Sequence, residues 1–246
     1  MKVAAIIQAR MGSTRLPGKV LKKVLNKTLL EYQIERVKRA KTIEEIIIAT
    51  TTKDSDDPII QLCQQLSVPY YRGSEEDVLA RYYEAATNFG VDVVVRLTSD
   101  CPIIDPNVID KVVRHYLENK DRYDYVSNTL ARTYPRGLDT EVVSYEVLKR
   151  AHEDAQGLEY REHVTAYIYC HPQQFKLSNT SNETDESKHR WTVDTEEDFE
   201  LIEKIISDLY PKDEHFTMND VLNLIQQNPT WFNINSHVEQ KKLNIY

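Results

Sequence analysis

Continuous apolar runs alternate with amphipathic stretches through the first half of the chain. Residues 3–7, 46–51 and 92–97 are mostly apolar or β-branched, instead of alternating with polar positions. Strands of this kind are buried on both faces, as in a parallel sheet that helices cover. Residues 68–72 predict a shorter strand. Because these strands alternate with helices, we expect an α/β fold in three layers, with a doubly wound, mostly parallel sheet.

The stretches between the strands predict helices, because their apolar residues recur at intervals of three and four. The expected helices cover residues 29–37, 56–66, 75–89 and 107–117. Pro58 lies in the first turn of the second helix, where its missing N–H does no harm.

The second half of the chain is less regular. We expect strands over residues 123–128 and 138–143. Helices are expected over residues 145–152, 159–169, 195–209 and 218–227, with Thr195 as the N-cap of the third. Residues 178–189 are polar and rich in turn formers, so they predict a mobile loop.

The bulk composition narrows the class of protein. The 246 residues are 41% hydrophobic, which is enough for a core, and their net charge of −8 argues against a broad nucleic-acid interface. Cys63, Cys101 and Cys170 are widely separated, which argues against a disulfide framework or a structural zinc site. The first apolar run is too short for a signal peptide, and no run approaches the about 20 residues that cross a bilayer. We therefore expect a cytoplasmic protein without nucleic-acid or membrane partners.

The carboxyl ends of the predicted strands mark the candidate site, because ligands of open α/β sheets bind beyond those ends. Three segments fall there, namely residues 8–19, 50–52 and 98–102. The first is strongly basic, with Arg10, Arg15 and Lys19 and no acidic residue before Glu31.

This first loop has the chemistry of an anion cradle. Gly12 and Gly18 let backbone N–H groups approach an anion, and the cations offset polyphosphate charge. It is not a Walker P-loop, because five residues separate the glycines and Val20 follows Lys19 in place of a hydroxyl residue. On these residues alone, a solvated basic loop between a strand and a helix is the alternative interpretation.

Longer motifs carry a family resemblance. The first is Ile7-Gln-Ala-Arg-Met-Gly-Ser-Thr-Arg-Leu-Pro-Gly-Lys-Val-Leu21, which resembles the N-terminal signature of the CMP-KDO and CMP-acylneuraminate synthetases. Further matches are Arg72-Gly-Ser-Glu-Glu-Asp-Val-Leu-Ala-Arg81, Arg96-Leu-Thr-Ser-Asp-Cys-Pro-Ile-Ile-Asp105 and Trp191-Thr-Val-Asp-Thr-Glu-Glu-Asp-Phe199. Together they resemble the spore-coat polysaccharide biosynthesis protein F branch of these cytidylyltransferases, over residues 2–206. The resemblance implies a fold of the nucleotide-diphospho-sugar transferase type.

The resemblance also implies a nucleotide site in the first half of the chain. Lys19 and Arg10 would bind the triphosphate and, with Asp100, carry catalysis. Ser13 and Arg15 would lie close to the phosphates. The other expected nucleotide contacts are Gln8, Ala9, Gly12, Thr51, Gly73, Asp77 and Arg81.

Asp100 and Asp194 are the candidate metal ligands that the resemblance implies. Nucleotidyl transfer needs Mg²⁺, which prefers carboxylate oxygens together with substrate phosphates and water. The alternatives are an ordinary turn aspartate at Asp100 and a carboxylate that complements a helix dipole at Asp194. The segment Arg-Leu-Thr-Ser-Asp departs from the Gln-Gly-Asp of the CMP-KDO enzymes, so the nucleotide half of the site is better founded than any specific sugar.

Polar clusters in the second half are the candidate acceptor contacts. Arg136 would grip a carboxylate or phosphonate through two hydrogen bonds. Asp139 and Glu141 would bind hydroxyls, or one of them would act as a base. Arg161 and His163 lie on an expected helix, where a salt-bridged helix surface is the alternative.

The sequence therefore predicts a single nucleotidyltransferase domain. Residues 1–128 would form its nucleotide-binding half, 129–190 a small acceptor-side or dimer lobe and 191–246 the C-terminal helices. The expected reaction transfers CMP from CTP, or from another NTP, to a sugar acid or related acceptor and releases pyrophosphate, in cell-surface or spore-coat polysaccharide synthesis. Relatives are often dimers, so the resemblance implies a homodimer. Glycosyl transfer from a nucleotide sugar and a non-catalytic nucleotide-binding subunit are the alternatives.

Overall fold

A computed structural model describes residues 1–240 of the chain. Within that range the main sheet has the strand order β5-β4-β1-β6-β8-β7-β9, and β2 and β3 form a separate hairpin. The strands are β1 (Val3–Gln8), β2 (Lys23–Val24), β3 (Lys27–Thr28), β4 (Glu45–Thr51), β5 (Tyr70–Gly73), β6 (Val93–Thr98), β7 (Tyr125–Ser127), β8 (Glu141–Ser144) and β9 (Leu177–Asn179).

The mostly parallel sheet that the apolar runs predict is confirmed. β1 lies between β4 and β6 and pairs with both in parallel, and β5 adds to β4 in the same direction. β8 runs antiparallel to its neighbours β6 and β7, so the sheet becomes mixed beyond β6. The carboxyl ends of β1, β4 and β6 meet at one edge, where a ligand is expected.

Helices and short 3-10 turns complete the described part of the chain. The helices are α1 (Leu29–Val37), α2 (Asp57–Gln65), α3 (Val78–Asn88), α4 (Pro106–Glu118), α5 (Tyr145–Asp154), α6 (Leu158–Glu162), α7 (Ala166–Cys170), α8 (Glu196–Leu209) and α9 (Met218–Gln227). The 3-10 turns are Lys19–Leu21, Asp54–Asp56 and Pro229–Ile234.

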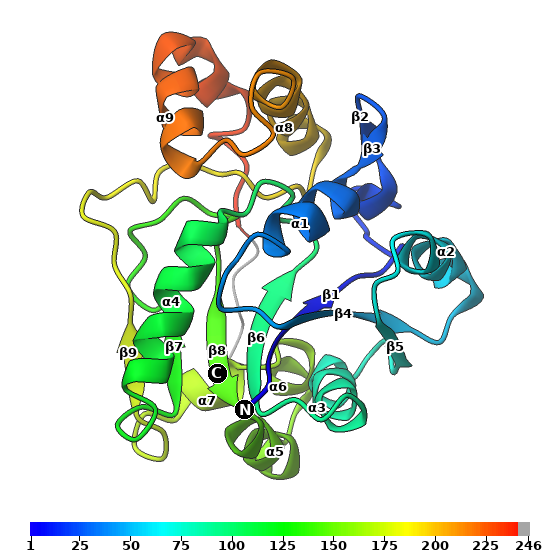
Figure 1. Cartoon of the computed structure of the whole chain (residues 1–246), viewed down its shortest axis with the longest axis vertical. Helices are drawn as coiled ribbons and strands as arrows, with labels where there is room; N and C mark the ends of the chain where they lie inside the picture. Colours follow the sequence, from blue (N-terminus) through cyan, green and yellow to red (C-terminus); the bar gives the residue numbers. More distant parts are fainter. Residues whose placement is uncertain (241–246) are drawn as a thin grey trace.

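Alternate side chains of β1 enter two different cores. Ala5 and Ile7 pack in the core that α1, α2 and α4 close on one face of the sheet. Ala4 and Ile6 pack in the core that α3, α5 and α7 close on the other face. All four are fully buried, so the predicted three-layer arrangement is present (Figure 1).

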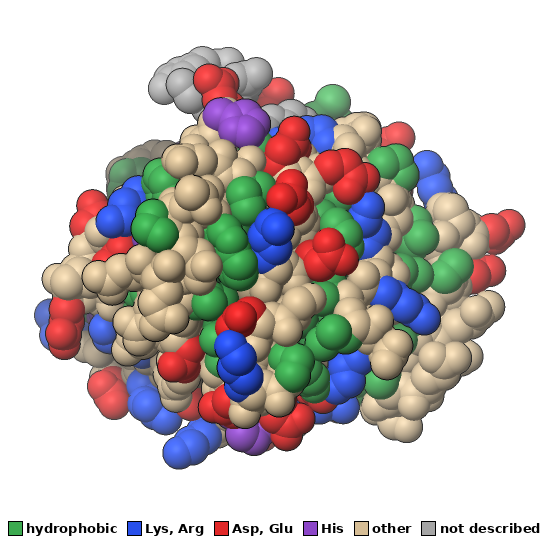
Figure 2. Space-filling view, turned by 90° about the horizontal axis from the view of Figure 1, so that it is seen from above, with side chains coloured by type: hydrophobic (Ala, Val, Ile, Leu, Met, Phe, Trp, Pro, Cys, Tyr) green, Lys and Arg blue, Asp and Glu red, His purple; other side chains and the backbone are tan. Residues whose placement is uncertain are grey.

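A third core joins the C-terminal helices to the start of the chain. α8 and α9 pack with Leu16, Val24 and Trp191, and Figure 1 shows them together at one end of the molecule, beside the β2–β3 hairpin. Thr195 accepts a hydrogen bond from the Asp198 backbone N–H and caps α8, as the sequence predicts. Figure 2 looks onto this end, where acidic and basic side chains interleave without a basic patch among the described residues in view.

The single helix expected over residues 159–169 is wrong. α6 ends before His163 and α7 begins at Ala166, and Val164 between them has a φ of 54°. A β-branched residue in the left-handed region cannot continue an α-helix. Val164 is fully buried in the core under α3 and α5, a tertiary contact that helical periodicity does not reveal.

The strand expected over residues 138–143 begins later, at Glu141. Gly137 has a φ of 104°, and a Cβ atom there would lie 2.7 Å from the Trp191 backbone, so only glycine fits at this crossing. Asn128 then holds the following loop, because its side chain accepts from Thr140 N and donates to the Leu138 carbonyl. Because of these contacts, the hydrogen bonding of β8 to its neighbours begins only at Glu141.

Residues 178–189, expected as a loop, include part of a strand. Ser178 and Asn179 belong to β9, which pairs in parallel with β7. Thr133 accepts from the backbone of both Asn182 and Glu186, which ties the remainder to the body. β9 and the β2–β3 hairpin escape sequence analysis because strands of two or three residues have too little periodicity to detect.

The C-terminal segment that the sequence assigns to residues 191–246 is described as far as residue 240. Residues 241–246 lie outside the described range. Among residues 1–240, no helix combines the length and the apolar character needed to cross a bilayer.

Candidate functional site

A cavity of about 260 Å³ opens beyond the carboxyl ends of β1 and β6. The loops that follow these strands, the first turn of α3, the end of α6 and the start of the segment before α8 surround it. The lining residues are Gln8, Ala9, Arg10, Ser13, Thr14, Arg15, Lys19, Val78, Arg81, Arg96, Thr98, Ser99, Asp100, Glu162, His163 and Asp194. Five separate stretches of sequence therefore meet here. Two of them include strand ends that the sequence marks, residues 8–19 and 98–100, whereas residues 50–52 do not line the cavity.

The basic loop is folded tightly by its own backbone. Met11 accepts hydrogen bonds from the N–H groups of Ser13 and Gly18 through its carbonyl. Gly18 has a φ of 67°, which returns the chain into the turn that begins at Lys19. The loop thus presents Arg10, Arg15 and Lys19 to the same cavity, together with Gln8, Ala9 and Ser13.

Asp56 fastens this loop to the body of the protein. It is 1% exposed and accepts a hydrogen bond from Met11 N at 2.7 Å through Oδ1. Its Oδ2 accepts from the Thr51 hydroxyl and, at 3.3 Å each, from Thr51 N and the Thr50 hydroxyl. A buried carboxylate with four donors fixes the backbone of the loop relative to β4.

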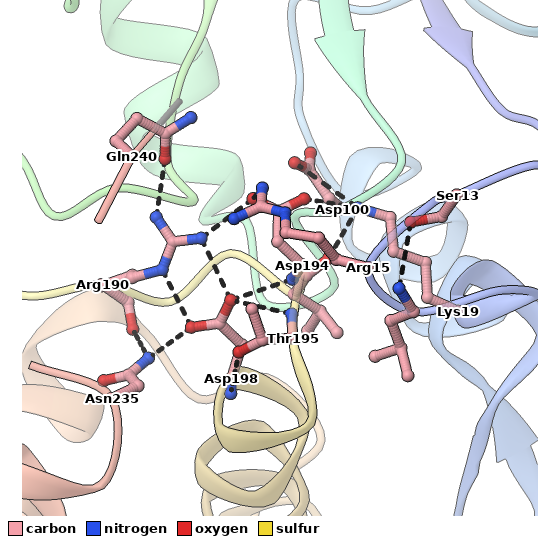
Figure 3. A network of polar contacts seen from close by, with 12 residues as sticks. Ser13, Arg15, Lys19, Asp100, Arg190, Asp194, Thr195, Asp198, Asn235 and Gln240 are labelled. Atoms are coloured by element: carbon pink, nitrogen blue, oxygen red, sulfur yellow. Dashed lines mark hydrogen bonds and ion pairs between the residues drawn. The ribbon is translucent and has the colours of Figure 1, made fainter. Parts of the chain in front are cut away.

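The two predicted metal ligands meet at Lys19 (Figure 3). The ammonium donates to Asp194 Oδ1 at 2.8 Å and to the Val193 carbonyl at 2.7 Å, and it lies 3.9 Å from Asp100 Oδ2. Arg15 pairs with Asp194 Oδ2 at 3.0 Å. Burial on its own would raise the pKa of Asp194, but the charge of Lys19, with Arg15 and Arg190, holds that pKa below its ordinary value.

A second network of hydrogen bonds, around Arg190 and Asp198, fixes the position of Asp194. Arg190 donates to Asp194 Oδ2 at 2.9 Å and to both oxygens of Asp198, which is fully buried. Asp198 also accepts from the backbone N–H groups of Asp194 and Thr195. Asn235 donates to Asp198 Oδ1 at 2.8 Å and to the Arg190 carbonyl at 2.9 Å. The position of Asp194 therefore depends on residues near the end of the described chain.

The other side of the cavity is built around Arg96 and Arg81. Arg96 on β6 pairs with Glu141 and donates to Gln8 Oε1 at 3.3 Å, and the Glu141 carboxylate raises the pKa of Arg96 although burial would lower it. Arg81 is 1% exposed, its Nε has no hydrogen-bond partner among the described residues, and burial lowers the pKa of its guanidinium.

Several predicted nucleotide contacts do not line the cavity. Thr51 is buried against Asp56, and Gly73 sits where a Cβ would meet Arg81 Cγ at 3.1 Å. Asp77 caps α3 through Ala80 N at 2.9 Å. Gly12 belongs to the loop, but it is absent from the cavity lining.

The predicted acceptor contacts are dispersed. Arg161 binds Asp77 through two of its nitrogens, and Asp139 binds Arg132 in the same bidentate way, at 2.5 and 2.7 Å. Glu141 is 7% exposed and accepts from Arg96, Thr165 and Tyr125, so it supports the cavity from below.

Arg136 and His163 differ from those three. His163 is the single member of the predicted acceptor set that lines the cavity. Arg136 lies outside the lining and pairs with Arg190 through the backbone. Burial lowers the pKa of the Arg136 guanidinium, and the nearby positive charges of Arg132 and Arg190 act in the same direction.

The structure adds lining residues that sequence analysis did not assign as site residues. Thr98 and Ser99 belong to a strand end that the sequence does mark as a ligand edge. Arg96 lies within a matched motif, four residues before Asp100, and it shares a face of β6 with Thr98, so its position was a usable signal. Thr14 and Val78 also lie within matched motifs, residues 7–21 and 72–81. Glu162 carries no comparable signal, and the folding of the chain brings it to the cavity.

The donor set at the meeting point of Asp100 and Asp194 fits a hard divalent cation. Both side chains offer carboxylate oxygens, which suit Mg²⁺. Among residues 1–240, no group of three or more His, Cys, Asp or Glu side chains gathers as a complete metal cage. This arrangement suits an ion that takes its remaining ligands from substrate phosphates and water.

Comparisons with known proteins agree on one family. The sequence model of a family described as cytidylyltransferase matches residues 4–235. A protein of Methanocaldococcus jannaschii described as uncharacterized is 39% identical, over 98% of this chain and 97% of its own length. Spore coat polysaccharide biosynthesis protein SpsF of Bacillus subtilis is 33% identical, over 91% of this chain and 94% of its own length.

Solved structures extend the comparison to the fold. A cytidylyltransferase from Leptospira borgpetersenii superposes with a TM-score of 0.90 at 36% identity, and the match covers 98% of this chain and all of that one. The CMP:2-keto-3-deoxy-manno-octonic acid synthetase, solved in complex with CTP, superposes with a TM-score of 0.67 at 16% identity, over 85% of this chain and all of the other. The second likeness shows the shared fold.

Proposed function

The chain belongs to the cytidylyltransferase family, and on that premise we propose that it transfers CMP from CTP to a sugar acid or related acceptor and releases pyrophosphate. The observation that carries the proposal is the convergence of Lys19 with Asp100 and Asp194 in one cavity. Cationic and acidic groups at the same point are what a triphosphate and its metal require.

The proposed reaction asks little covalent chemistry of the protein. An acceptor oxygen attacks the α-phosphorus of CTP in line with the leaving pyrophosphate. Lys19, Arg10 and Arg15 neutralise the charge that moves onto the pyrophosphate, and the loop that Asp56 fastens holds them in position. Positioning and charge neutralisation lower the barrier, as in phosphoryl transfer generally.

We propose Mg²⁺ as the cofactor, with Asp100 and Asp194 as its protein ligands. When bound, the ion would supply Lewis-acid stabilisation of the phosphate oxygens. The role of this chain is to orient Asp194, because Arg190 and Asp198 fix its carboxylate and backbone. Asp100 follows β6 directly, so the sheet edge orients it.

Two residues bear on the nature of the acceptor. His163 lines the cavity, and the Arg136 guanidinium has no hydrogen-bond partner or ion pair among the described residues. An arginine without a direct ion pair among the described residues favours an acceptor that carries a carboxylate or another anion. The similarity to SpsF supports a place in cell-surface or spore-coat polysaccharide synthesis. A cytoplasmic location and a homodimer are further predictions, which fractionation and sedimentation velocity would check.

Pyrophosphate release tests the reaction. The full chain is incubated with Mg²⁺, each of the four ribonucleoside triphosphates and a panel of sugar acids, and pyrophosphate is measured. We expect release with CTP and at least one acceptor. Glycosyl transfer from a nucleotide sugar without pyrophosphate, or nucleotide binding without turnover of any acceptor, contradicts the proposal.

Asp100→Asn tests the metal ligand. The amide keeps the size of the side chain and removes its charge, so we expect a higher Mg²⁺ concentration at half-maximal rate. Asp105→Asn serves poorly as a control, since Asp105 caps α4. Asp54→Asn, in an exposed turn, is the better control. Equal Mg²⁺ dependence in Asp100→Asn and the parent counts against the assignment.

A further inference from the structure

Lys19 lies where the two carboxylates meet, at hydrogen-bond distance from Asp194 and 3.9 Å from Asp100. The side chains of Lys19, Asp194 and Asp100 are 13%, 14% and 22% exposed, so water screens these charges only partly. Two of the three ammonium hydrogens have protein acceptors, namely Asp194 Oδ1 and the Val193 carbonyl. A positive charge of the protein itself therefore holds the position between both carboxylates (Figure 3).

The cations around Asp194 are of two kinds. Arg190 is 6% exposed and is anchored by the buried Asp198, so it is a permanent part of the site. Lys19 and Arg15 come instead from the basic loop of residues 8–19, which we call the phosphate loop, and Arg15 is 39% exposed. The loop cations have a second set of partners in the proposed reaction, the phosphates of CTP. Only these two can leave Asp194 without unpairing a buried charge.

We propose that Lys19 is an exchangeable counter-ion of the metal site, so that the divalent cation enters with the nucleotide or after it, and not before. The inference rests on the proposed function. A triphosphate offers the ammonium several anionic oxygens and draws it off Asp194. The freed carboxylates then receive the dication, which an ammonium at the same point repels. Arg190 stays in place and keeps Asp194 oriented through the exchange.

The proposal makes a specific claim about the protein without nucleotide: its affinity for a divalent cation is low because of Lys19. Mn²⁺ is the probe, because its electron paramagnetic resonance signal reports the free ion. The full chain is titrated with Mn²⁺ in the absence of nucleotide. Lys19→Met is expected to bind Mn²⁺ at least about tenfold more tightly than the parent, since one neighbouring charge shifts an ionic equilibrium at a carboxylate by about one to three powers of ten.

Lys22→Met is the matched control. It removes the same charge from a residue three positions on, whose ammonium pairs with Glu196, a side chain that is 68% exposed. We expect the Mn²⁺ affinity of Lys22→Met to equal that of the parent. The double variant Lys19→Met with Asp194→Asn is expected to lose the gain, which places the ion at this carboxylate. If Lys19→Met does not fold, as judged by circular dichroism, Lys19→Gln replaces it.

Equal Mn²⁺ affinity in Lys19→Met and the parent overturns the inference. A gain that survives Asp194→Asn, or that Lys22→Met reproduces, overturns it as well, because a general loss of positive charge then explains the result. The readout needs no turnover. A chain that shows the expected gain but releases no pyrophosphate with any acceptor keeps the counter-ion role of Lys19 and loses the proposed function.

Discussion

The two sides of the cavity differ in how far the sequence predicts their contacts. On the phosphate-loop side, Arg10, Arg15 and Lys19 reach the cavity together, as their spacing in one motif predicts. On the side of residues 129–190, polar residues that look like ligand contacts in the sequence form ion pairs within the protein, as Glu141 does with Arg96. A polar cluster in a compact loop can be interpreted from sequence because its residues lie close together along the chain. A polar cluster in an irregular lobe takes partners that are distant in sequence, so its contacts do not follow from a local pattern.

The largest expected effect concerns the phosphate-loop side. Lys19→Ala removes a charge that the proposed reaction uses at the phosphates, so we expect kcat/KM to fall on the order of 10²–10³-fold. Pyrophosphate release measures the rate, and circular dichroism checks the fold. Lys22→Ala, on the same segment, is expected to keep the parental rate. Parental activity in Lys19→Ala would remove the phosphate-loop argument.

Glu141→Ala tests the opposite side. The substitution leaves Arg96 with its charge in a mostly buried position and without its carboxylate partner, so we expect a loss of about 3 kcal/mol in the free energy of unfolding. Urea denaturation followed by fluorescence measures it. Glu141→Gln keeps the shape and is expected to lose less. If stability is unchanged and the KM for the acceptor rises, Glu141 contacts the acceptor after all, and the contrast between the two sides disappears.

Arg136→Ala sharpens the comparison within the irregular lobe. Hydrogen bonds to a charged group contribute about 1.5–3 kcal/mol, so loss of an acceptor contact should raise the KM for the acceptor by about tenfold or more. The KM for CTP should not change. Lys188→Ala, an exposed residue of the same lobe, is the control. Equal increases in both KM values would indicate a general disturbance of the site.

Asp56→Asn gives the smallest effect that we expect to resolve. An amide replaces the carboxylate that accepts from Met11 N, so the phosphate loop is held less firmly. We expect the dissociation constant for CTP to rise about fivefold, since one hydrogen bond contributes about 1 kcal/mol. Equilibrium dialysis without acceptor measures it, with Asp54→Asn as the control. An unchanged dissociation constant means that the loop needs no anchor at this point.

The sequence predicts the sheet and the placement of the cavity because both depend on local patterns. The apolar runs at β1, β4 and β6 specify strands buried on both faces, and the ends of parallel strands must share an edge. The family signature adds Lys19 and Asp194, which are far apart in sequence and meet in the structure.

Other features depend on contacts that no local pattern contains. Val164 adopts a left-handed conformation because its side chain is buried in a core formed by other helices. Thr51 donates its hydroxyl to the buried Asp56 and does not line the cavity. Arg161 on α6 pairs with Asp77, which caps a different helix, α3. Each of these features is set by a tertiary contact.

The hydrogen bonds from Asn235 to Asp198 and to the Arg190 carbonyl have a consequence for biosynthesis. During translation the N-terminal part of a chain emerges first. The phosphate loop and Asp100 are then available long before Asn235 leaves the ribosome, but Asp194 has not yet received its supports. In a nascent chain, Asp194 therefore lacks these supports until Asn235 has been synthesised and has folded against Asp198.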